Sequence, residues 1–165
     1  MDDPVPPRTE DGLCAPFNME DAPWQDEHQD IPGFALRCRQ LARFGGAQNI
    51  GVEVCELPPG KQAWPSHYHM AEEEQIWVLE GGATLHLGER TYEMTAGDYV
   101  VFPAGQKAGH AMVNNTGAVC RYLVIGEHKG NEVVVYTKSN KVAVRVLGER
   151  YDRAGLMTYW QGETD

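Results

Sequence analysis

The sequence predicts an all-β protein, an antiparallel sandwich or barrel, with little helix. Short β-prone runs recur at regular spacing from Gly33 onward, Gly- and Pro-rich turn signals separate them, and no long amphipathic stretch occurs. The chain has 165 residues, of which 42% are apolar, so it has the size and the apolar content of one domain with a real core. We therefore expect residues 31–165 to form a single domain of packed strands.

Residues 1–30 differ in composition from the rest of the chain. They contain nine Asp or Glu and a single basic residue, Arg8, together with frequent prolines. We expect an extended acidic arm here, with Phe17 and Trp24 as isolated apolar anchors. The segment has neither a basic region nor an apolar run, so it does not resemble a signal peptide, and the cytoplasm is the expected location.

The expected strands follow the arm in order, and turn residues separate them. Pro58 to Gly60 end the second run, Gly81 and Gly82 end the third, and Gly88 divides the fourth into a hairpin. Helix is expected for a turn or two only. The runs cover residues 34–44, 50–57, 74–80, 83–94, 98–103, 110–115, 120–127, 132–137 and 141–147.

Charge and cysteine content exclude several classes of protein. The net charge of −10 argues against binding to nucleic acid or to an anionic membrane surface. No apolar stretch approaches the roughly 20 residues of a membrane helix. The four cysteines form no Cys-x-x-Cys pair, so a zinc ribbon is not supported, and without an export signal we expect reduced thiols.

Three histidines and a glutamate form the most informative pattern. His67 and His69 are two residues apart, so a strand places both imidazoles on one face. Among three consecutive glutamates, Glu74 shares its parity with Ile76 and Val78, which would carry it into the interior. A buried carboxylate is costly unless it meets a cation. Metal ligation is therefore a natural role for Glu74.

The other two glutamates of that run, Glu72 and Glu73, are expected in a connecting turn, in water. His110 begins a separate strand some forty residues later and shares parity with Met112 and Asn114. From this position it could close a metal site that no local segment can build.

With these residues in this order, the sequence resembles the cupin superfamily. The first cupin motif reads here Gly60, six residues, His67-Tyr68-His69, four residues, Glu74, six residues, Gly81. The second reads Gly97, five residues, Pro103-Ala104-Gly105, four residues, His110, three residues, Asn114. The spacer after Gly60 is one residue longer than usual and the gap before His110 is two residues longer. The resemblance covers residues 50–126 firmly and the remainder more weakly.

The resemblance implies a double-stranded β-helix, the jelly-roll barrel of RmlC-like cupins, in a small bacterial stand-alone protein. It implies that His67, His69, Glu74 and His110 hold one divalent transition metal ion, and this ligand set suits Fe, Mn, Ni, Zn or Cu. Some proteins of this group carry sugar-phosphate-isomerase labels. Small cupins commonly form homodimers in which N-terminal strands cross to the partner, and the arm fits that arrangement.

Three functions are compatible with this reading. The first is a metal-dependent oxygenase, isomerase or lyase that acts on a small polar molecule, in some cases one like a sugar phosphate. The second is a non-catalytic cupin that binds a metal or small ligand as a sensor or store, and the third is a structural cupin with a vestigial site. Tyr99, Phe102 and Met112 could line the substrate pocket, although an ordinary position in the barrel core is the favoured interpretation of each. No catalytic residue beyond the ligands is identified.

Overall fold

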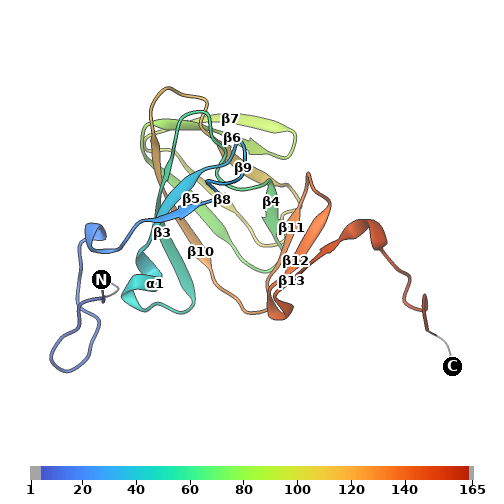
Figure 1. Ribbon diagram of the computed structural model, residues 1–165, viewed down its shortest axis with the longest axis horizontal. Coiled ribbons are helices and arrows are strands. Elements are labelled where there is room, and N and C mark those ends of the chain that lie inside the picture. Colours follow the sequence, from blue (N-terminus) through green and yellow to red (C-terminus); the bar gives the residue numbers. More distant parts are fainter. Residues whose placement is uncertain (1–4, 164–165) are drawn as a thin grey trace.

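The computed structural model describes residues 5–163 and consists of two antiparallel sheets packed face to face (Figure 1). The first sheet has the order β1-β2-β3-β10-β5-β8, and the second has the order β13-β12-β11-β4-β9-β6-β7. Strands that are distant in sequence alternate in both sheets, as in a jelly roll. The predicted all-β jelly-roll class is thus confirmed.

The strands are short, as the spacing of the turn signals predicts. Their bounds are Gln25–Glu27 (β1), Leu36–Gln40 (β2), Ile50–Leu57 (β3), His67–His69 (β4), Glu74–Glu80 (β5), Gly82–Leu87 (β6), Arg90–Thr95 (β7), Tyr99–Phe102 (β8), His110–Val113 (β9), Cys120–Glu127 (β10), Val133–Tyr136 (β11), Lys141–Val144 (β12) and Glu149–Asp152 (β13).

Helix is limited to one short α-helix, α1 (Leu41–Gly45), and three 3-10 turns, Met19–Asp21, Arg145–Leu147 and Arg153–Gly155, within residues 5–163. The first expected run, 34–44, is a strand only to residue 40. Its second half is α1, which ends where Gly46 adopts a left-handed backbone with φ 92°. Strand β13 was not expected from the sequence.

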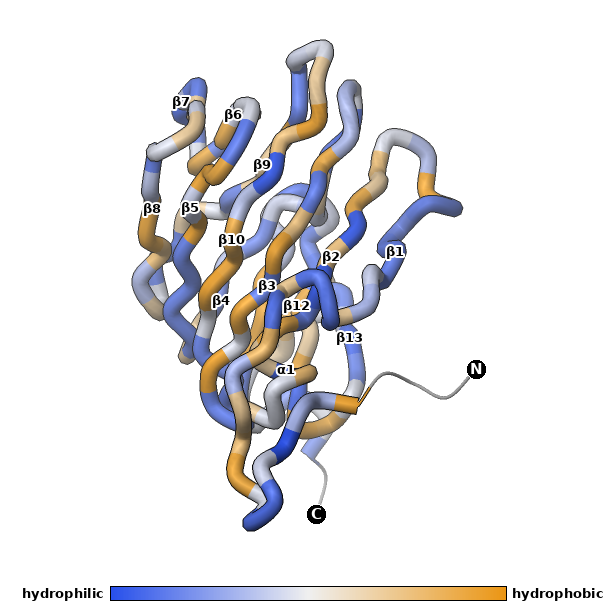
Figure 2. Tube along the Cα trace, turned by 90° about the vertical axis from the view of Figure 1, so that its left-hand side faces the viewer, coloured by the Kyte–Doolittle hydropathy of each residue, from blue (hydrophilic) through white to orange (hydrophobic). Residues whose placement is uncertain are grey.

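The hydrophobic core lies between the two sheets. β3 and β10 carry hydrophobic runs, while β1 at the sheet edge is hydrophilic (Figure 2). Strand β10 pairs with both β3 and β5, and so occupies the centre of its sheet. The most deeply buried apolar side chains include Leu36, Leu57, Val78, Cys120 and Tyr122. This core supports the inner face on which the histidines lie.

The N-terminal arm packs against its own chain. The ring of Phe17 meets that of Phe44 edge to face, with centroids 5.1 Å apart. Trp24 lies under two guanidinium groups, at 4.6 Å from Arg37 and 4.4 Å from Arg39. Both predicted anchors thus contact α1 or β2 of the same chain. Residues 1–4 of the expected arm, and 164–165 of the expected domain, lie outside the described residues.

Two of the cysteines form a disulfide, which corrects the expectation of reduced thiols. Cys38 of β2 and Cys55 of β3 are directly opposite each other in the strand register, with Cα atoms 4.2 Å apart, and their sulfur atoms are bonded. Cys14 and Cys120 are free, the first exposed and the second buried. The pairing was not evident from spacing because it depends on the register of two adjacent strands.

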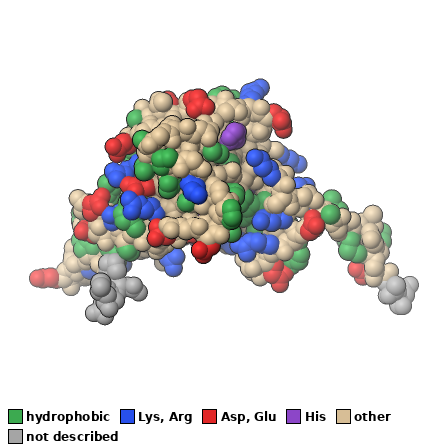
Figure 3. Space-filling model, turned by 45° about the horizontal axis from the view of Figure 1, so that its top comes forward, with side chains coloured by type: hydrophobic (Ala, Val, Ile, Leu, Met, Phe, Trp, Pro, Cys, Tyr) green, Lys and Arg blue, Asp and Glu red, His purple; other side chains and the backbone are tan. Residues whose placement is uncertain are grey.

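The molecular surface carries mixed charges. Acidic, basic and hydrophobic side chains are interspersed over the face drawn in Figure 3, so the net negative charge is not gathered into one patch there. Among residues 5–163, no helix is both long and apolar enough to cross a membrane.

Candidate metal centre

Both sheets contribute to the histidine cluster. β4 carries His67 and His69 on one face, as their spacing predicts, and β9 lies antiparallel beside β4 with His110 directly opposite His67. Glu74 comes from the start of β5 in the other sheet. The lengthened loop before His110 therefore does not displace it, since the register places it next to His67.

One ligand atom from each of His67, His69, Glu74 and His110 lies within 4.8 Å of all the others. Nε2 of His110 is 3.1 Å from Oε1 of Glu74, and Nε2 of His69 is 3.3 Å from Oε2 of the same carboxylate. The ring centroids of His67 and His110 are 4.6 Å apart. The four side chains converge on one point, as a mononuclear site requires.

His67 has the protonation state that a metal ligand needs. Its Nδ1 lies 2.8 Å from the carbonyl oxygen of Pro65, to which it can donate, and this leaves the lone pair on Nε2. Burial, helped by His110, lowers the pKa of His67 to about 4. The imidazole is therefore neutral at physiological pH.

Glu74 is charged despite its burial. Burial by itself would raise the pKa of this carboxyl, but the hydrogen bond with His110 and the close approach of the His69 ring outweigh it and hold the pKa well below its usual range. Burial also lowers the pKa of His69, yet the nearby Glu74, with Glu132 and Glu72, raises it overall. The cluster thus has one anionic oxygen among three imidazoles.

This donor set fits a divalent transition metal ion. Both ring nitrogens of His69 and Nδ1 of His110 are buried without a hydrogen-bond partner among the described residues. Buried polar atoms without partners are rare in proteins and call for an explanation such as an ion. Three nitrogens and one carboxylate oxygen suit Fe, Mn, Ni, Zn or Cu, and the residues do not distinguish among these metals.

A second set of carboxylates lies behind His69. Nδ1 of His69 is 3.6 Å from Oε2 of Glu72 and 3.6 Å from Oε1 of Glu132. Glu132 is fully buried and accepts hydrogen bonds from the backbone N–H groups of Met70 at 2.8 Å and Ala71 at 3.0 Å. Carboxylates in this position orient a ligating imidazole and increase its basicity.

The position of Glu72 corrects the expectation that it lies in water. Its side chain is buried and forms a two-pronged ion pair with Arg145, with Nη2 3.0 Å from Oε2. Arg145 follows β12, so the C-terminal hairpin supplies the cation that makes this burial possible. Glu73, by contrast, is half-buried.

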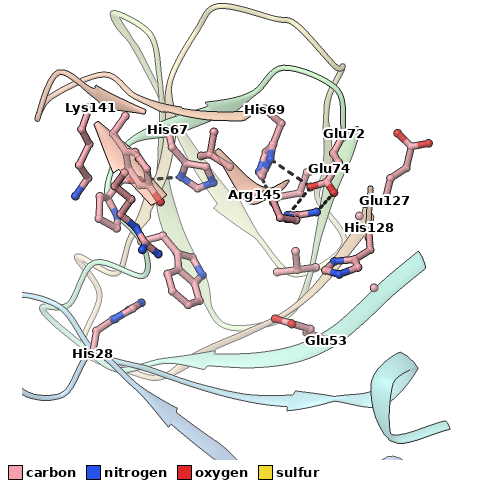
Figure 4. A pocket seen from close by; sticks show the side chains of 18 residues that line it. His28, Glu53, His67, His69, Glu72, Glu74, Glu127, His128, Lys141 and Arg145 are labelled. Carbon is pink, nitrogen blue, oxygen red and sulfur yellow. Dashed lines mark hydrogen bonds and ion pairs between the residues drawn. The ribbon is translucent and has the colours of Figure 1, made fainter. Parts of the chain in front are cut away.

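A pocket of about 530 Å³ leads to the cluster (Figure 4). His67, His69 and Glu74 line it, together with Trp64 and Tyr136. His110 lies behind these residues, against an internal cavity of only about 30 Å³. A metal ion held by the four side chains would therefore face the pocket and have the protein core behind it.

Known proteins share this architecture. Residues 53–126 match the Cupin domain family, and this segment contains all four residues of the cluster. A proposed sugar phosphate isomerase from Acidithiobacillus ferrooxidans is 29% identical, with a TM-score of 0.75 over 83% of this chain and 88% of that chain. Residues 53–126 of this chain therefore form a cupin domain.

Two further relatives widen the comparison. The structure of a cupin-superfamily sugar phosphate isomerase from Silicibacter pomeroyi is 25% identical, with a TM-score of 0.76 over 88% of this cupin and 98% of that chain. Quercetin 2,3-dioxygenase of Bacillus subtilis (strain 168) is 32% identical over 103 residues, which are 62% of this cupin. The matched segment spans only 27% of the dioxygenase.

The three residues predicted to line the cupin's pocket have different positions. Tyr99 is 55% exposed and pairs with Trp77 on the outer face of the sheet, so the structure does not bring it to the pocket. Phe102 is buried and stacks on His110, with centroids 3.8 Å apart and planes 6° apart. Met112 is buried against the small internal cavity. The last two support the cluster from the core side.

Sequence reasoning missed a carboxylate in the pocket. Glu53 of β3 lines it, and burial, followed by the charges of Glu74 and Glu27, raises the pKa of Glu53. A carboxyl with a raised pKa in a cleft is a candidate for proton transfer. The sequence did contain a signal for it. Glu53 lies two and four residues before the buried Cys55 and Leu57, so a strand places all three side chains on the same, inner face.

Proposed function

We propose that this cupin binds one divalent transition metal ion through His67, His69, Glu74 and His110, and that it is a metal-dependent enzyme of the oxygenase, isomerase or lyase type. The main support is that four candidate ligand atoms lie within 4.8 Å of one another at the base of a pocket that can hold a small molecule. A bound ion would supply Lewis-acid or redox chemistry at that point.

The surrounding residues support an enzyme rather than a passive binder. Trp64 and Tyr136 offer apolar surfaces beside the cluster, and Glu53 offers a carboxyl with a raised pKa inside the pocket, which suits a role in proton transfer. Two relatives bear the name sugar phosphate isomerase and another is a quercetin dioxygenase. Sugar phosphates and small oxidisable compounds are therefore the first substrates to screen, with and without O2.

Metal content tests the first half of the proposal. Protein purified without chelator, or reconstituted with each candidate metal, should hold close to one ion per chain. The His67→Ala/His110→Ala variant should lose the ion and keep its circular dichroism spectrum. His86→Ala is the matched control, because this histidine lies on the neighbouring strand β6, outside the cluster. Wild-type protein that takes up no transition metal on titration would overturn the proposal.

Activity tests the second half. Once a substrate is found, Glu53→Gln should lower kcat by roughly 10²–10⁴-fold, the usual contribution of a proton-transfer residue, while metal content stays unchanged. Full metal occupancy with no turnover across the screen would instead favour the alternative function, a cupin that binds a metal or small ligand as a sensor or store. The four-residue cluster supports that alternative equally, but the position and raised pKa of Glu53 favour the enzyme.

We also propose that the cupin forms a homodimer. Trp77 and Tyr99 lie side by side on the outer face of β5 and β8 and are 47% and 55% exposed, and contiguous exposed apolar side chains mark protein–protein contacts. Sedimentation velocity should give twice the mass of the chain, and a Trp77→Glu/Tyr99→Glu variant should sediment as a monomer. Sedimentation of the wild type as a monomer would contradict this proposal.

A further inference from the structure

We propose that the pocket contains a second, basic subsite, formed by Lys141, Arg150 and His28, which takes the phosphate or carboxylate group of a small substrate. The inference rests on the proposed function, because it specifies the class of molecule that the same pocket receives. None of these three residues belongs to the four-residue cluster, and all of them line the pocket.

The C-terminal hairpin directs two cations into the pocket. Lys141 is paired with Tyr136 in the strand register, and Arg150 is paired with Ala143, which lies two residues from Lys141 on the same strand. Residues paired in this way, or two apart, share one face of a sheet. Lys141 and Arg150 therefore face the pocket with Tyr136, and neither forms an ion pair with a carboxylate of residues 5–163.

His28 comes to the same side of the pocket from the opposite end of the chain. Figure 4 shows it below Lys141, on the side of the view away from Glu53 and Glu127. Its Nε2 is buried and has no hydrogen-bond partner among the described residues. Its backbone is left-handed, with φ 59°, which is uncommon for a residue other than glycine. A ligand oxygen would provide the partner that this nitrogen lacks.

The carboxylates of the pocket do not cancel this basic side. Glu72 is neutralised by Arg145, and Glu127 pairs with Lys129 at 2.7 Å. Glu74 belongs to the proposed metal centre, and burial raises the pKa of Glu53. Asp152 lies opposite Lys141 in the strand register but forms no ion pair with it. Lys141 and Arg150 are thus without an ion-paired carboxylate among residues 5–163, and a phosphate or carboxylate group would satisfy them through charge-assisted hydrogen bonds.

Tyr136 sets the distance between the two subsites. Its ring centroid is 4.6 Å from Nζ of Lys141 and 6.0 Å from the ring centroid of His67. A molecule of a few carbon atoms can therefore place its anionic group on the basic side while its other end reaches the cluster. The pocket volume of about 530 Å³ is consistent with a ligand of that size.

Calorimetric titration of inorganic phosphate and of malonate into chelator-treated protein tests the subsite separately from the metal. Wild-type protein should bind at least one of the two anions. The anion that binds with the higher affinity shows whether the subsite prefers a phosphate or a carboxylate group. Lys141→Met/Arg150→Gln should weaken that binding at least about tenfold, the loss expected when charge-assisted hydrogen bonds are removed. Lys138→Met/Arg153→Gln is the matched control, with the same charge change on exposed residues outside the pocket.

Three results would overturn the inference. These are no binding of either anion to the wild type, equal affinity in the pocket variant and the control, or binding that appears only with metal and survives in the pocket variant. His28→Phe provides a second variant, because it keeps a ring beside Trp64, whose centroid is 4.2 Å away, and removes only the nitrogens. It should weaken anion binding several-fold even if the hairpin variant is unstable.

The two proposals fail in different ways. Wild-type protein that binds phosphate but takes up no metal would refute the metal centre and leave the basic subsite standing. Protein that holds metal but binds neither anion would refute the basic subsite and leave the metal centre standing. The metal content of the Lys141→Met/Arg150→Gln variant should equal that of the wild type.

Discussion

Glu132 offers the sharpest test of how the site is held together. Its carboxylate accepts hydrogen bonds from the N–H groups of Met70 and Ala71, in the turn between the proposed ligands His69 and Glu74. It also lies 3.6 Å from Nδ1 of His69. In Glu132→Gln, one oxygen becomes an NH2 group, which cannot accept from the backbone. One of these two N–H groups therefore loses its carboxylate acceptor, although Met70 also donates to the carbonyl of Val133 at 3.0 Å, and one of the two negative charges behind His69 disappears.

The structure sets the expected size of both effects. Loss of one hydrogen bond to a buried charged group costs about 1.5–3 kcal/mol of unfolding free energy. Loss of a carboxylate that orients a ligating histidine lowers metal affinity by roughly 10–100-fold. Urea unfolding of the metal-free protein measures the first effect, and competition with a chromophoric chelator measures the second.

Glu127→Gln is the matched control for Glu132→Gln. Glu127 accepts the N–H group of Glu73 at 3.0 Å in the same turn but has no contact with His69. It is less buried, so its replacement should cost less stability and leave metal affinity within about threefold of the wild type. Equal metal affinities in the two variants would refute a role for Glu132 in positioning His69.

Four other perturbations have defined outcomes. Iodoacetamide should label Cys14 and spare Cys120 in the native protein, because burial raises the pKa of Cys120 to about 11; mass spectrometry of peptides would show this. Burial raises the pKa of Glu56, but hydrogen bonds from two arginines outweigh it and leave the pKa low, so this carboxylate stabilises the fold above its usual pKa near 4.5. Glu56→Gln should therefore destabilise the protein at neutral pH in chemical unfolding. The difference should shrink as the pH falls below 4.5 and vanish below the lowered pKa of the native carboxyl; a constant difference would contradict this. Phe102→Leu should cost roughly 1–2 kcal/mol in urea unfolding and weaken metal binding, because His110 loses the ring stacked on it. Removal of metal by a chelator should lower the unfolding free energy by about 2.7 kcal/mol relative to protein with free ion at about 100 times Kd, and unchanged thermal melting would contradict it.

Local patterns in the sequence were sufficient for much of the fold and for the four-residue cluster. Period-two alternation predicted that His67 and His69 share one face of a strand, and it separated Glu74 from its two neighbours. Turn glycines were also predictable: Gly81 and Gly97 have φ values of 73° and 97°, which a side chain would disfavour. The helical second half of the run 34–44 was missed, because short apolar segments do not distinguish strand from helix.

What the sequence alone determined is the identity of the four residues proposed to hold the metal, since alternation along β4 and β5 and the two cupin motifs are properties of neighbouring residues. Only the tertiary structure decided what surrounds that centre. The ion pair of Glu72 with Arg145, the support from Glu132 and the basic subsite join segments that are far apart in the chain, and the disulfide depends on the register of two neighbouring strands. Their side chains meet because of strand order and register, which depend on how the whole sheet packs.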